Sequence, residues 1–420
     1  MSKGTARRRI QTVAIANRGE VAVRIMHACR ELGIRTVLLH SEVDVLTRAY
    51  RMADVRVCIG PAALNESYLS IENVVNGALA GGADAVHPGF GFLSENADFA
   101  QAVVSAGMIF IGPKPESIRA AGDKISAKKL VEQAKAPTVP GYMGADQRIE
   151  SLVEEAVRIG FPVIVKAAAG GGGRGMKVIR SRAEAAEQIA SAQREGQAAF
   201  GSPIVFLEKY LDRAKHIEFQ IFGDFTGQVV SLMERECSVQ RRHQKIIEEA
   251  LSPSLTPELR RAMGDTAKRL AESAQYQSAG TVEFLLQDGA FYFLEMNTRL
   301  QVEHPVTEMV LGIDLVKAQI LNAAQEFMVW PEESLRPHGH AIECRIYAEN
   351  PYQAGMPSTG PLLGVAWPEG PGRRFETGVE TGDAVTSFYD PMIAKVIVWD
   401  ETRLRAIKKM KATLAESVVL

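Results

Sequence analysis

Cysteine is scarce in this chain of 420 residues. Its four cysteines, Cys29, Cys58, Cys237 and Cys344, are scattered and form no C-x-x-C pair. This spacing fits a reducing compartment and argues against a disulfide framework or a zinc site. We therefore expect the protein to work in the cytoplasm.

An excess of charge and a long apolar run are also missing. The 48 basic and 50 acidic residues give a formal net charge of −2, so no global positive field would attract nucleic acid or an anionic membrane. No window approaches the roughly 20 apolar residues of a membrane span. The basic start MSKGTARRRI lacks the apolar segment of a secretory signal, and we interpret it as a short solvated tail.

The chain is too long for one simple core, so two or three domains are expected. Over residues 1–121, short apolar segments such as TVAIA alternate with helical patterns, the first of which closes at Gly33. This alternation predicts a parallel sheet with helices on both faces, a Rossmann-like domain. Within it, Ser94 is the expected N-cap of a helix that stops at Gly107.

Beyond residue 121 the pattern changes twice. We predict a linker helix over 122–138, a compact alternating domain over 139–210, and a larger domain with long antiparallel strands over 211–420. The fold class is therefore α/β combined with α+β. The last helical pattern ends in apolar residues, and we expect the fold to continue beyond that point.

One stretch, FLEMNTRLQVEHP, places polar side chains at every second position: Glu295, Asn297, Arg299, Gln301 and Glu303. In an extended chain these side chains share one face. The wet face of an ordinary antiparallel strand also alternates, but acidic residues and asparagine are poor strand formers. A Glu-x-Asn pair supplies the carboxylate and carbonyl oxygens that Mg²⁺ prefers.

Glu283 is the natural partner of Glu295 across a predicted hairpin whose turn signal is Asp288-Gly289. A two-residue turn would pair Glu283 with Leu294 and put the two carboxylates on opposite faces. A longer connection, or one bulge, would put them on the same face. We expect the longer connection, because a shared metal requires a common face.

A glycine run lies between two predicted strands in VIVKAAAGGGGRGMKVI, where Lys166 ends the first strand. Glycine lets backbone N–H groups approach an anion closely, and a neighbouring lysine adds positive charge for a phosphate. It is no Walker loop, because G-x-x-x-x-G-K-[ST] is absent. A flexible hairpin loop remains the alternative interpretation.

Two further lysines have positions that suggest a site. Lys124 opens a predicted helix, and Lys245 lies in the polar run CSVQRRHQKIIEEA. Such a run is usually a solvated face. This run follows a strand in the domain that carries the alternating row, which favours a functional interpretation. The stretch LEKYL at 207–211 joins two domains, a suitable place to bury an adenine ring.

Ten stretches along nearly the whole chain occur in the order of one known family. They are IANRGE, HPGFGFLSENA, FIGP, GDK, GGGGRGM, EKYL, RRHQKIIEEA, FLEMNTRLQVEHPVTEM, GHAIECRI and YDPMIAK. The chain resembles the biotin carboxylase component of biotin-dependent carboxylases, which is an ATP-grasp enzyme. ECRIYAENPY is most similar to the acyl-CoA carboxylase branch.

The resemblance implies an ATP-grasp fold, with 1–121 as the N-terminal domain, 139–210 as a mobile lid and 211–420 as the C-terminal domain. It also implies an ATP-dependent ligase that carries out the first half-reaction of an acyl-CoA carboxylase. ATP would phosphorylate bicarbonate to carboxyphosphate, and the ureido nitrogen of biotin would then be carboxylated.

Site residues follow from the same resemblance. The family binds ATP at the positions of Lys124, Lys166, Gly172, Gly173, Glu208, Lys209, Tyr210, Leu211, His216 and His243. Two Mg²⁺ or Mn²⁺ ions would lie at Glu283, Glu295 and Asn297. The bicarbonate and biotin residues would be Lys245, Arg299, Gln301, Val302, Glu303 and Arg345. Among these, Glu303 would be the general base, with Lys245, Arg299 and Arg345 as the other catalytic residues.

The biotin acceptor motif is missing, since Met410-Lys411 lies in a helical pattern without the flanking residues. We therefore expect biotin to arrive on a separate carrier protein, with a carboxyltransferase as a further partner and a homodimer or larger complex as the assembly. Three departures from the family pattern stand out: Ala168 and Ala169 before the glycines, Phe90 where tyrosine is usual, and an end near residue 420, short of the usual strand and helix.

Three alternatives remain open from the residues. Another ATP-grasp ligase would share the metal row and phosphate loop, but not RLQVEH together with ECRI. A nicotinamide-dependent dehydrogenase is disfavoured, because ANRGEVA contains only Gly19 of the G-x-G-x-x-G motif. A non-catalytic nucleotide sensor could have kept the site and lost activity through the Ala168, Ala169 or Phe90 changes.

Overall fold

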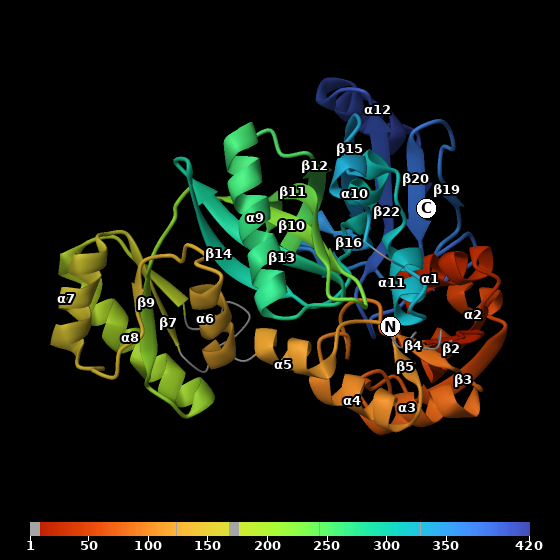
Figure 1. Cartoon of the computed structure of the whole chain (residues 1–420), viewed down its shortest axis with the longest axis horizontal. Helices are drawn as coiled ribbons and strands as arrows, with labels where there is room; N and C mark the ends of the chain where they lie inside the picture. The colour runs from red at the N-terminus through yellow and green to blue at the C-terminus, as the bar shows by residue number, and fades with distance from the viewer. Residues whose placement is uncertain (1–8, 123, 168–175, 243, 328) are drawn as a thin grey trace, which may run out of the picture. The chain divides into compact units, whose positions relative to one another are not determined.

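The computed structural model describes residues 9–122, 124–167, 176–242, 244–327 and 329–420 (Figure 1). The chain divides into two compact units. The first comprises residues 1–136, 216–284 and 294–420, and the second comprises 137–215 and 285–293. Within the described residues, every helix is too short or too polar to cross a membrane.

The first unit begins with a five-stranded parallel sheet in the order β3-β2-β1-β4-β5. Its strands are β1 (Thr12–Ile15), β2 (Arg35–Ser41), β3 (Val55–Gly60), β4 (Ala85–His87) and β5 (Ile109–Phe110). The accompanying helices are α1 (Gly19–Glu31), α2 (Arg48–Met52), α3 (Ile71–Ala80), α4 (Ala97–Ser105), α5 (Pro115–Gly122) and α6 (Lys124–Gln133). Val13 packs with α1, whereas its neighbour Ala14 packs with α3 and α4. Helices therefore cover both faces, which confirms the Rossmann-like prediction.

The cap of α4 differs from the sequence prediction. The N-cap is Asn96, whose side-chain oxygen accepts a hydrogen bond of 2.9 Å from the Phe99 backbone N–H. Ser94 is buried two residues earlier, and its Oγ has no hydrogen-bond partner. The prediction of Ser94 was wrong because serine and asparagine are both good caps, and the helix begins two residues later.

The second unit contains a four-stranded sheet in the order β6-β9-β7-β8. Its strands are β6 (Gly141–Tyr142), β7 (Val163–Ala167), β8 (Met176–Ile179) and β9 (Val205–Lys209), and its helices are α7 (Ile149–Ile159) and α8 (Arg182–Phe200). All three strand pairings are antiparallel. Two strands flank the glycine run as predicted, while residues 168–175 lie outside the described residues.

An eight-stranded sheet follows the order β14-β13-β10-β11-β12-β15-β22-β20. Its strands are β10 (Lys215–Gly223), β11 (Val229–Arg241), β12 (Gln244–Ala250), β13 (Ser278–Gln287), β14 (Ala290–Asn297), β15 (His340–Tyr347), β20 (Arg373–Thr377) and β22 (Met392–Asp400). From β10 to β20, each neighbouring pair is antiparallel. The predicted long antiparallel strands thus form one sheet.

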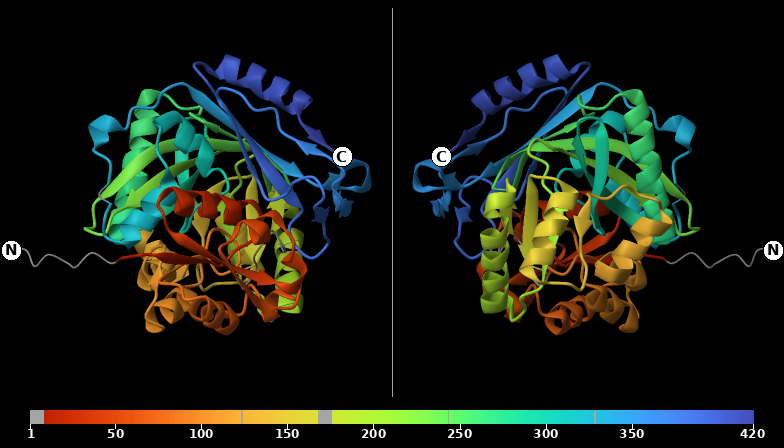
Figure 2. Two further views of the ribbon diagram at one scale, coloured as in Figure 1. Left: turned by 90° about the vertical axis from the view of Figure 1, so that its right-hand side faces the viewer. Right: turned by 90° about the vertical axis from the view of Figure 1, so that its left-hand side faces the viewer.

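Helices cover both faces of this sheet, as Figure 2 shows for α12. The helices are α9 (Pro257–Ser273), α10 (His304–Leu311), α11 (Leu315–Ala323) and α12 (Arg403–Glu416). Val396 packs with Met410 of α12, whereas the next residue, Ile397, packs with Val306 of α10. Because side chains alternate along a strand, α10 and α12 lie on opposite faces.

Short elements complete the chain. The strand pairs are β16 (Glu349–Asn350) with β17 (Met356–Pro357), β18 (Gly360–Pro361) with β21 (Ala384–Val385), and β19 (Val365–Ala366) with β23 (Val418–Val419). The 3-10 turns are Glu42–Asp44, Leu64–Glu66, Glu332–Ser334 and Pro351–Gln353.

The hairpin between β13 and β14 corrects a second prediction. Only Asp288 and Gly289 connect the strands, with φ of 52° and 79°, so the expected longer connection is wrong. Even so, Asn297 Nδ2 donates a 2.8 Å hydrogen bond to Glu283 Oε1, so these two side chains reach a common face. A regular two-residue hairpin would place Glu283 opposite Leu294. Asn297 is the last residue of β14, so its side chain makes this contact where the chain leaves the strand.

The α4 cap gives a test of the fold. We expect Asn96→Ala to lower the free energy of unfolding by about 1 kcal/mol, because the Phe99 N–H loses its acceptor. Ser94→Ala is the matched control and should cost less, since the Ser94 hydroxyl has no hydrogen bond to lose. Urea denaturation of both variants makes the comparison, and equal losses would contradict the cap assignment.

Candidate active site

The site lies in the first unit, and Lys245 of β12 is at its centre. Its Nζ lies 2.5 Å from Glu218 Oε2, 2.9 Å from Glu283 Oε1 and 2.8 Å from Glu303 Oε1. Burial acts to lower the pKa of Lys245, but Glu218 and Glu303 outweigh it, and the pKa is raised well above its ordinary value. Lys245 is therefore a fixed positive charge shared by three carboxylates from separate parts of the sequence.

Glu303, the N-cap residue of α10, lies between two cations. Its Oε1 contacts Lys245, and its Oε2 accepts a 3.0 Å hydrogen bond from Arg345 Nη2 of β15. Arg345 Nε also donates to Glu248 Oε1 at 2.6 Å. Burial alone would raise the pKa of Glu303, but Lys245, Arg345 and Arg235 hold it well below its ordinary value. The carboxylate is therefore ionised at neutral pH.

Arg235 of β11 lies beneath this arrangement with no exposed side-chain area. Its Nε donates to Glu218 Oε1 at 2.5 Å, and its Nη2 donates to Gln301 Oε1 at 2.8 Å. The other donors reach Gln220 Oε1, Thr307 Oγ1 and Thr281 Oγ1. A buried guanidinium with all its hydrogen bonds made holds its partners rigidly.

The predicted metal ligands lie in the middle of β13, which carries Glu283, and at the end of β14, which carries Glu295 and Asn297. Glu283 accepts hydrogen bonds of 2.8 Å from both Asn297 Nδ2 and Gln301 Nε2. His216 Nε2 lies 2.6 Å from Glu283 Oε2, and the His216 and Lys245 contacts lower the Glu283 pKa to about 2 against the effect of burial. Glu295 is more exposed, and its pKa is raised by lost hydration and by Glu283.

This donor set fits a hard cation. Two carboxylates and the Asn297 amide oxygen are the oxygen ligands that Mg²⁺ and Mn²⁺ accept. His216, Glu218 and Glu283 additionally bring one ligand atom each to within 4.8 Å of one another. The low pKa of Glu283 keeps its carboxylate charged, as a metal ligand must be.

Arg299 lies at the rim of the site and is partly buried. Its Nε donates to Glu95 Oε2 at 2.8 Å, and its Nη1 donates to the Leu300 carbonyl at 3.2 Å. Burial acts to lower the pKa of Arg299, but Glu95 raises it. The Nε edge of the guanidinium is therefore bound to the exposed Glu95 carboxylate. A bound anion can take the place of that carboxylate.

The predicted ATP-binding residues are divided between the units. In the second unit, Lys166 of β7 forms an ion pair with Glu208 of β9, and Lys209 Nζ donates to the Gly160 and Phe161 carbonyls at 2.8 Å. Tyr210 and Leu211 follow β9 and are half-buried. His216 belongs to the first unit. Gly172, Gly173, His243 and the side chain of Lys124 lie outside the described residues.

Sequence patterns missed four residues that contact the predicted ones: Glu95, Glu218, Arg235 and Glu248. A weak signal existed for Glu218, which lies two residues after His216 on a predicted strand and so shares its face. Arg235 is a lone arginine within VVSLMERE, and a charge in a buried strand needs partners. No local pattern marks Glu95 as the partner of Arg299 or Glu248 as the partner of Arg345.

The chain matches three family models. They are "Biotin carboxylase, N-terminal domain" over 9–118, "Carbamoyl-phosphate synthase L chain, ATP binding domain" over 123–328, and "Biotin carboxylase C-terminal domain" over 343–420. A biotin carboxylase of Allochromatium vinosum is 49% identical over 98% of this chain and 91% of its own length. The mitochondrial methylcrotonoyl-CoA carboxylase subunit alpha of Dictyostelium discoideum is 47% identical over 97% of this chain, which spans 58% of that longer protein.

Solved structures agree with these matches. A biotin carboxylase complex with βγ-ATP from Campylobacter jejuni has a TM-score of 0.91 at 41% identity, covering 98% of this chain and 92% of that one. The biotin carboxylase domain dimer of Hydrogenobacter thermophilus 2-oxoglutarate carboxylase, with MgADP, ADP and bicarbonate, has a TM-score of 0.89 at 43% identity, covering 98% and 91%.

Fold, site and comparisons together define an ATP-grasp enzyme, an ATP-dependent ligase. The chain belongs to the biotin carboxylase family. The sequence resemblance and the predicted ATP-grasp fold are therefore confirmed. The residue roles remain predictions.

Arg235 gives a test of the buried charges. We expect Arg235→Met to lower the free energy of unfolding by about 3–5 kcal/mol, because it leaves Glu218 buried with a charge imbalance. Adding Glu218→Gln should recover part of that loss. Arg403→Met is the matched control: Arg403 is exposed and pairs with Glu249, so its loss should cost at most about 1 kcal/mol. Denaturant unfolding measures all three, and equal losses in the two single variants would contradict this account.

Proposed function

We propose that Glu303 acts as the general base that removes the proton of bicarbonate. The ionised state of Glu303 suits this role, but Lys245 and Arg345 make it a weak base while both cations contact it. A bicarbonate bound against Lys245 would share that positive charge. The pKa of Glu303 would then rise toward the value that proton transfer needs.

Lys245, Arg299, Gln301 and the backbone of Val302 would bind the bicarbonate in this proposal. Arg299 is suited to a bidentate contact with the deprotonated anion, which would take the place of Glu95, the partly exposed carboxylate that Arg299 Nε now contacts. The oxygen of bicarbonate would attack the γ-phosphorus of ATP. Carboxyphosphate and ADP are the products of this step.

Arg345 would bind the ureido oxygen of biotin and stabilise the negative charge that develops there when the ureido nitrogen loses its proton. Carboxyphosphate then transfers its carboxyl group to that nitrogen, and the phosphate that it releases takes up the ureido proton. Phe90, half-buried among the core side chains, would contribute packing without a hydroxyl.

Glu283, Glu295 and Asn297 would hold two metal ions, either Mg²⁺ or Mn²⁺. When bound, the metal neutralises phosphate charge during phosphoryl transfer. The nucleotide itself would be bound by the ATP-binding residues predicted above, including Lys166 and Glu208 to Leu211 of the second unit. Closure of that unit over ATP would exclude water and protect carboxyphosphate.

Biotin would arrive on a separate carrier protein, and a carboxyltransferase would use the carboxybiotin as the second half of an acyl-CoA carboxylase. A homodimer or larger complex in the cytoplasm is part of the same proposal. The observation that carries the proposal is the ionised Glu303 carboxylate held between Lys245 and Arg345.

Release of ADP tests the reaction. With ATP and Mg²⁺ present, we expect ADP release to require bicarbonate and to rise when biotin is added, since bicarbonate accepts the phosphoryl group and biotin consumes the product. The measurement is coupled ADP detection with each substrate omitted in turn. Release that ignores both omissions would overturn the proposal in favour of another ATP-grasp ligase.

Arg299→Ala tests the bicarbonate site. We expect bicarbonate-dependent ADP release to fall at least a hundredfold, because the anion loses its bidentate contact. Arg405→Ala, which removes an exposed arginine from α12, is the matched control and should keep full activity. Unchanged turnover in Arg299→Ala would mean that the bicarbonate site does not work as proposed, and would favour a nucleotide-binding protein without carboxylase activity.

A further inference from the structure

A row of charged side chains crosses three strands on the face of the sheet that α10 covers. Lys395 of β22 lies opposite Arg345 of β15 on one side and opposite Glu376 of β20 on the other. Paired residues in neighbouring strands point to the same face, and Ile397, two residues from Lys395, packs against α10. The row therefore ends at Arg345, which contacts Glu303.

Lys395 has no exposed side-chain area and is not among the residues given a role above. Its Nζ donates a 2.8 Å hydrogen bond to the backbone carbonyl of Val302. The same Nζ lies 3.3 Å from Glu20 Oε2 and 3.9 Å from Glu376 Oε2. The buried Lys395 ammonium thus connects Val302, in the segment before α10, to the carboxylates of Glu20 and Glu376.

The position of Lys395 conflicts with simple sheet energetics. Two cations directly opposite each other on neighbouring strands repel, and burial makes this repulsion stronger. Arg345 holds the Glu303 side chain, and Lys395 holds the carbonyl of the preceding residue, Val302. The pair of cations therefore fixes two successive residues of one segment, which an apolar side chain at position 395 could not do.

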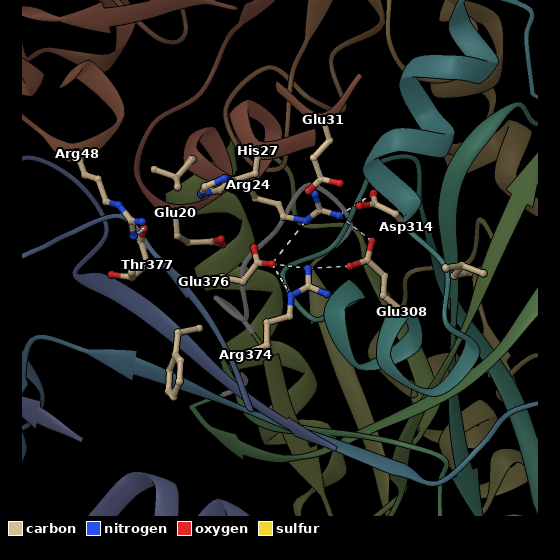
Figure 3. Close-up of a pocket in the computed structure, with 13 residues that line it drawn as sticks. Glu20, Arg24, His27, Glu31, Arg48, Glu308, Asp314, Arg374, Glu376 and Thr377 are labelled. Carbon is tan, nitrogen blue, oxygen red and sulfur yellow. Dashed lines mark hydrogen bonds and ion pairs between the residues drawn. The ribbon is translucent and has the colours of Figure 1, made fainter. Parts of the chain in front are cut away.

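One of the two carboxylates behind Lys395, that of Glu376, is held in place by arginines. Glu376 forms ion pairs with Arg374 and Arg24, which line a cavity of about 260 Å³ (Figure 3). Arg24 also reaches Glu308 of α10 at 3.0 Å. Burial raises the pKa of Glu20, which also lines the cavity, to about 7 despite Lys395. Glu20 is nevertheless the nearer carboxylate to the ammonium, at 3.3 Å against 3.9 Å for Glu376.

We propose that Lys395 is a positioning residue for bicarbonate activation: by holding the Val302 carbonyl, it sets the place of Val302 and Glu303 relative to Lys245 and Arg345. This inference rests on the proposed function of Glu303. A general base must lie within hydrogen-bond reach of its proton, and a displacement of about 1 Å costs roughly a hundredfold in rate. Loss of the tether thus acts on the bicarbonate step and spares nucleotide binding.

The test compares three variants. Lys395→Met removes the ammonium but leaves its counterions buried. Lys395→Met combined with Glu20→Gln removes one of those carboxylates as well, and so limits the destabilisation. Glu20→Gln alone is the matched control: it keeps the Val302 contact and resembles the protonated form of Glu20. The measurements are the KM for bicarbonate, the KM for ATP and kcat in ADP release, with thermal unfolding recorded for each variant.

We expect both Lys395 variants to raise the KM for bicarbonate about 10- to 100-fold while the KM for ATP changes less than about twofold. Glu20→Gln should behave like the parent chain. KM does not depend on the folded fraction of a preparation, so partial unfolding of Lys395→Met cannot imitate this split. Equal changes in the two KM values, or a double variant with the kinetics of Glu20→Gln, would overturn the inference.

Glu303→Gln separates this inference from the function on which it rests. If Glu303→Gln abolishes bicarbonate-dependent ADP release while the Lys395 variants keep the parent KM for bicarbonate, only the positioning role fails. If Glu303→Gln keeps full activity, the proposed general base fails, and the positioning role fails with it.

Discussion

The buried Glu303 carboxylate, held between Lys245 and Arg345, is the interaction on which the arrangement of the site depends. A buried charge is costly unless it is paired, and each cation that pairs with it needs further counterions. Lys245 therefore also contacts Glu218, and Arg345 also contacts Glu248. One functional carboxylate thus accounts for a network of charges that reaches three strands of the sheet, β10, β12 and β15.

Such a network has a chemical consequence. With Lys245 and Arg345 in contact, the pKa of Glu303 lies well below its ordinary value, and the carboxylate is a poor base. Substrates that draw these cations away raise its basicity only when they are bound. In the proposed function the base is therefore strongest when bicarbonate and biotin are both in place, which limits unproductive hydrolysis of ATP.

Local patterns in the sequence predicted the parallel sheet and the antiparallel strands, because these depend on neighbours a few residues apart. The alternating row is extended only as far as Asn297, and Arg299, Gln301 and Glu303 follow the end of the strand. The same patterns could not predict the contacts of Arg235 or Lys395, buried charges whose partners are set by sheet register far along the chain. The cap at Asn96 was missed because two suitable residues lie close together. The hairpin was mistaken because its Asp288-Gly289 turn makes the two-residue connection that the turn signal itself indicates.

The segment that carries Glu303 has no extended hydrogen-bonded neighbour strand to fix it, so other contacts must do so. Lys395 holds the Val302 carbonyl, His304 Nδ1 lies 2.8 Å from the Gln301 carbonyl, and Arg235 binds the Gln301 side chain. Pro305 in the first turn of α10 restricts the backbone further. Four constraints thus act on the five residues 301–305. A general base can be placed this accurately because its support comes from a packed sheet and a helix rather than from a free loop.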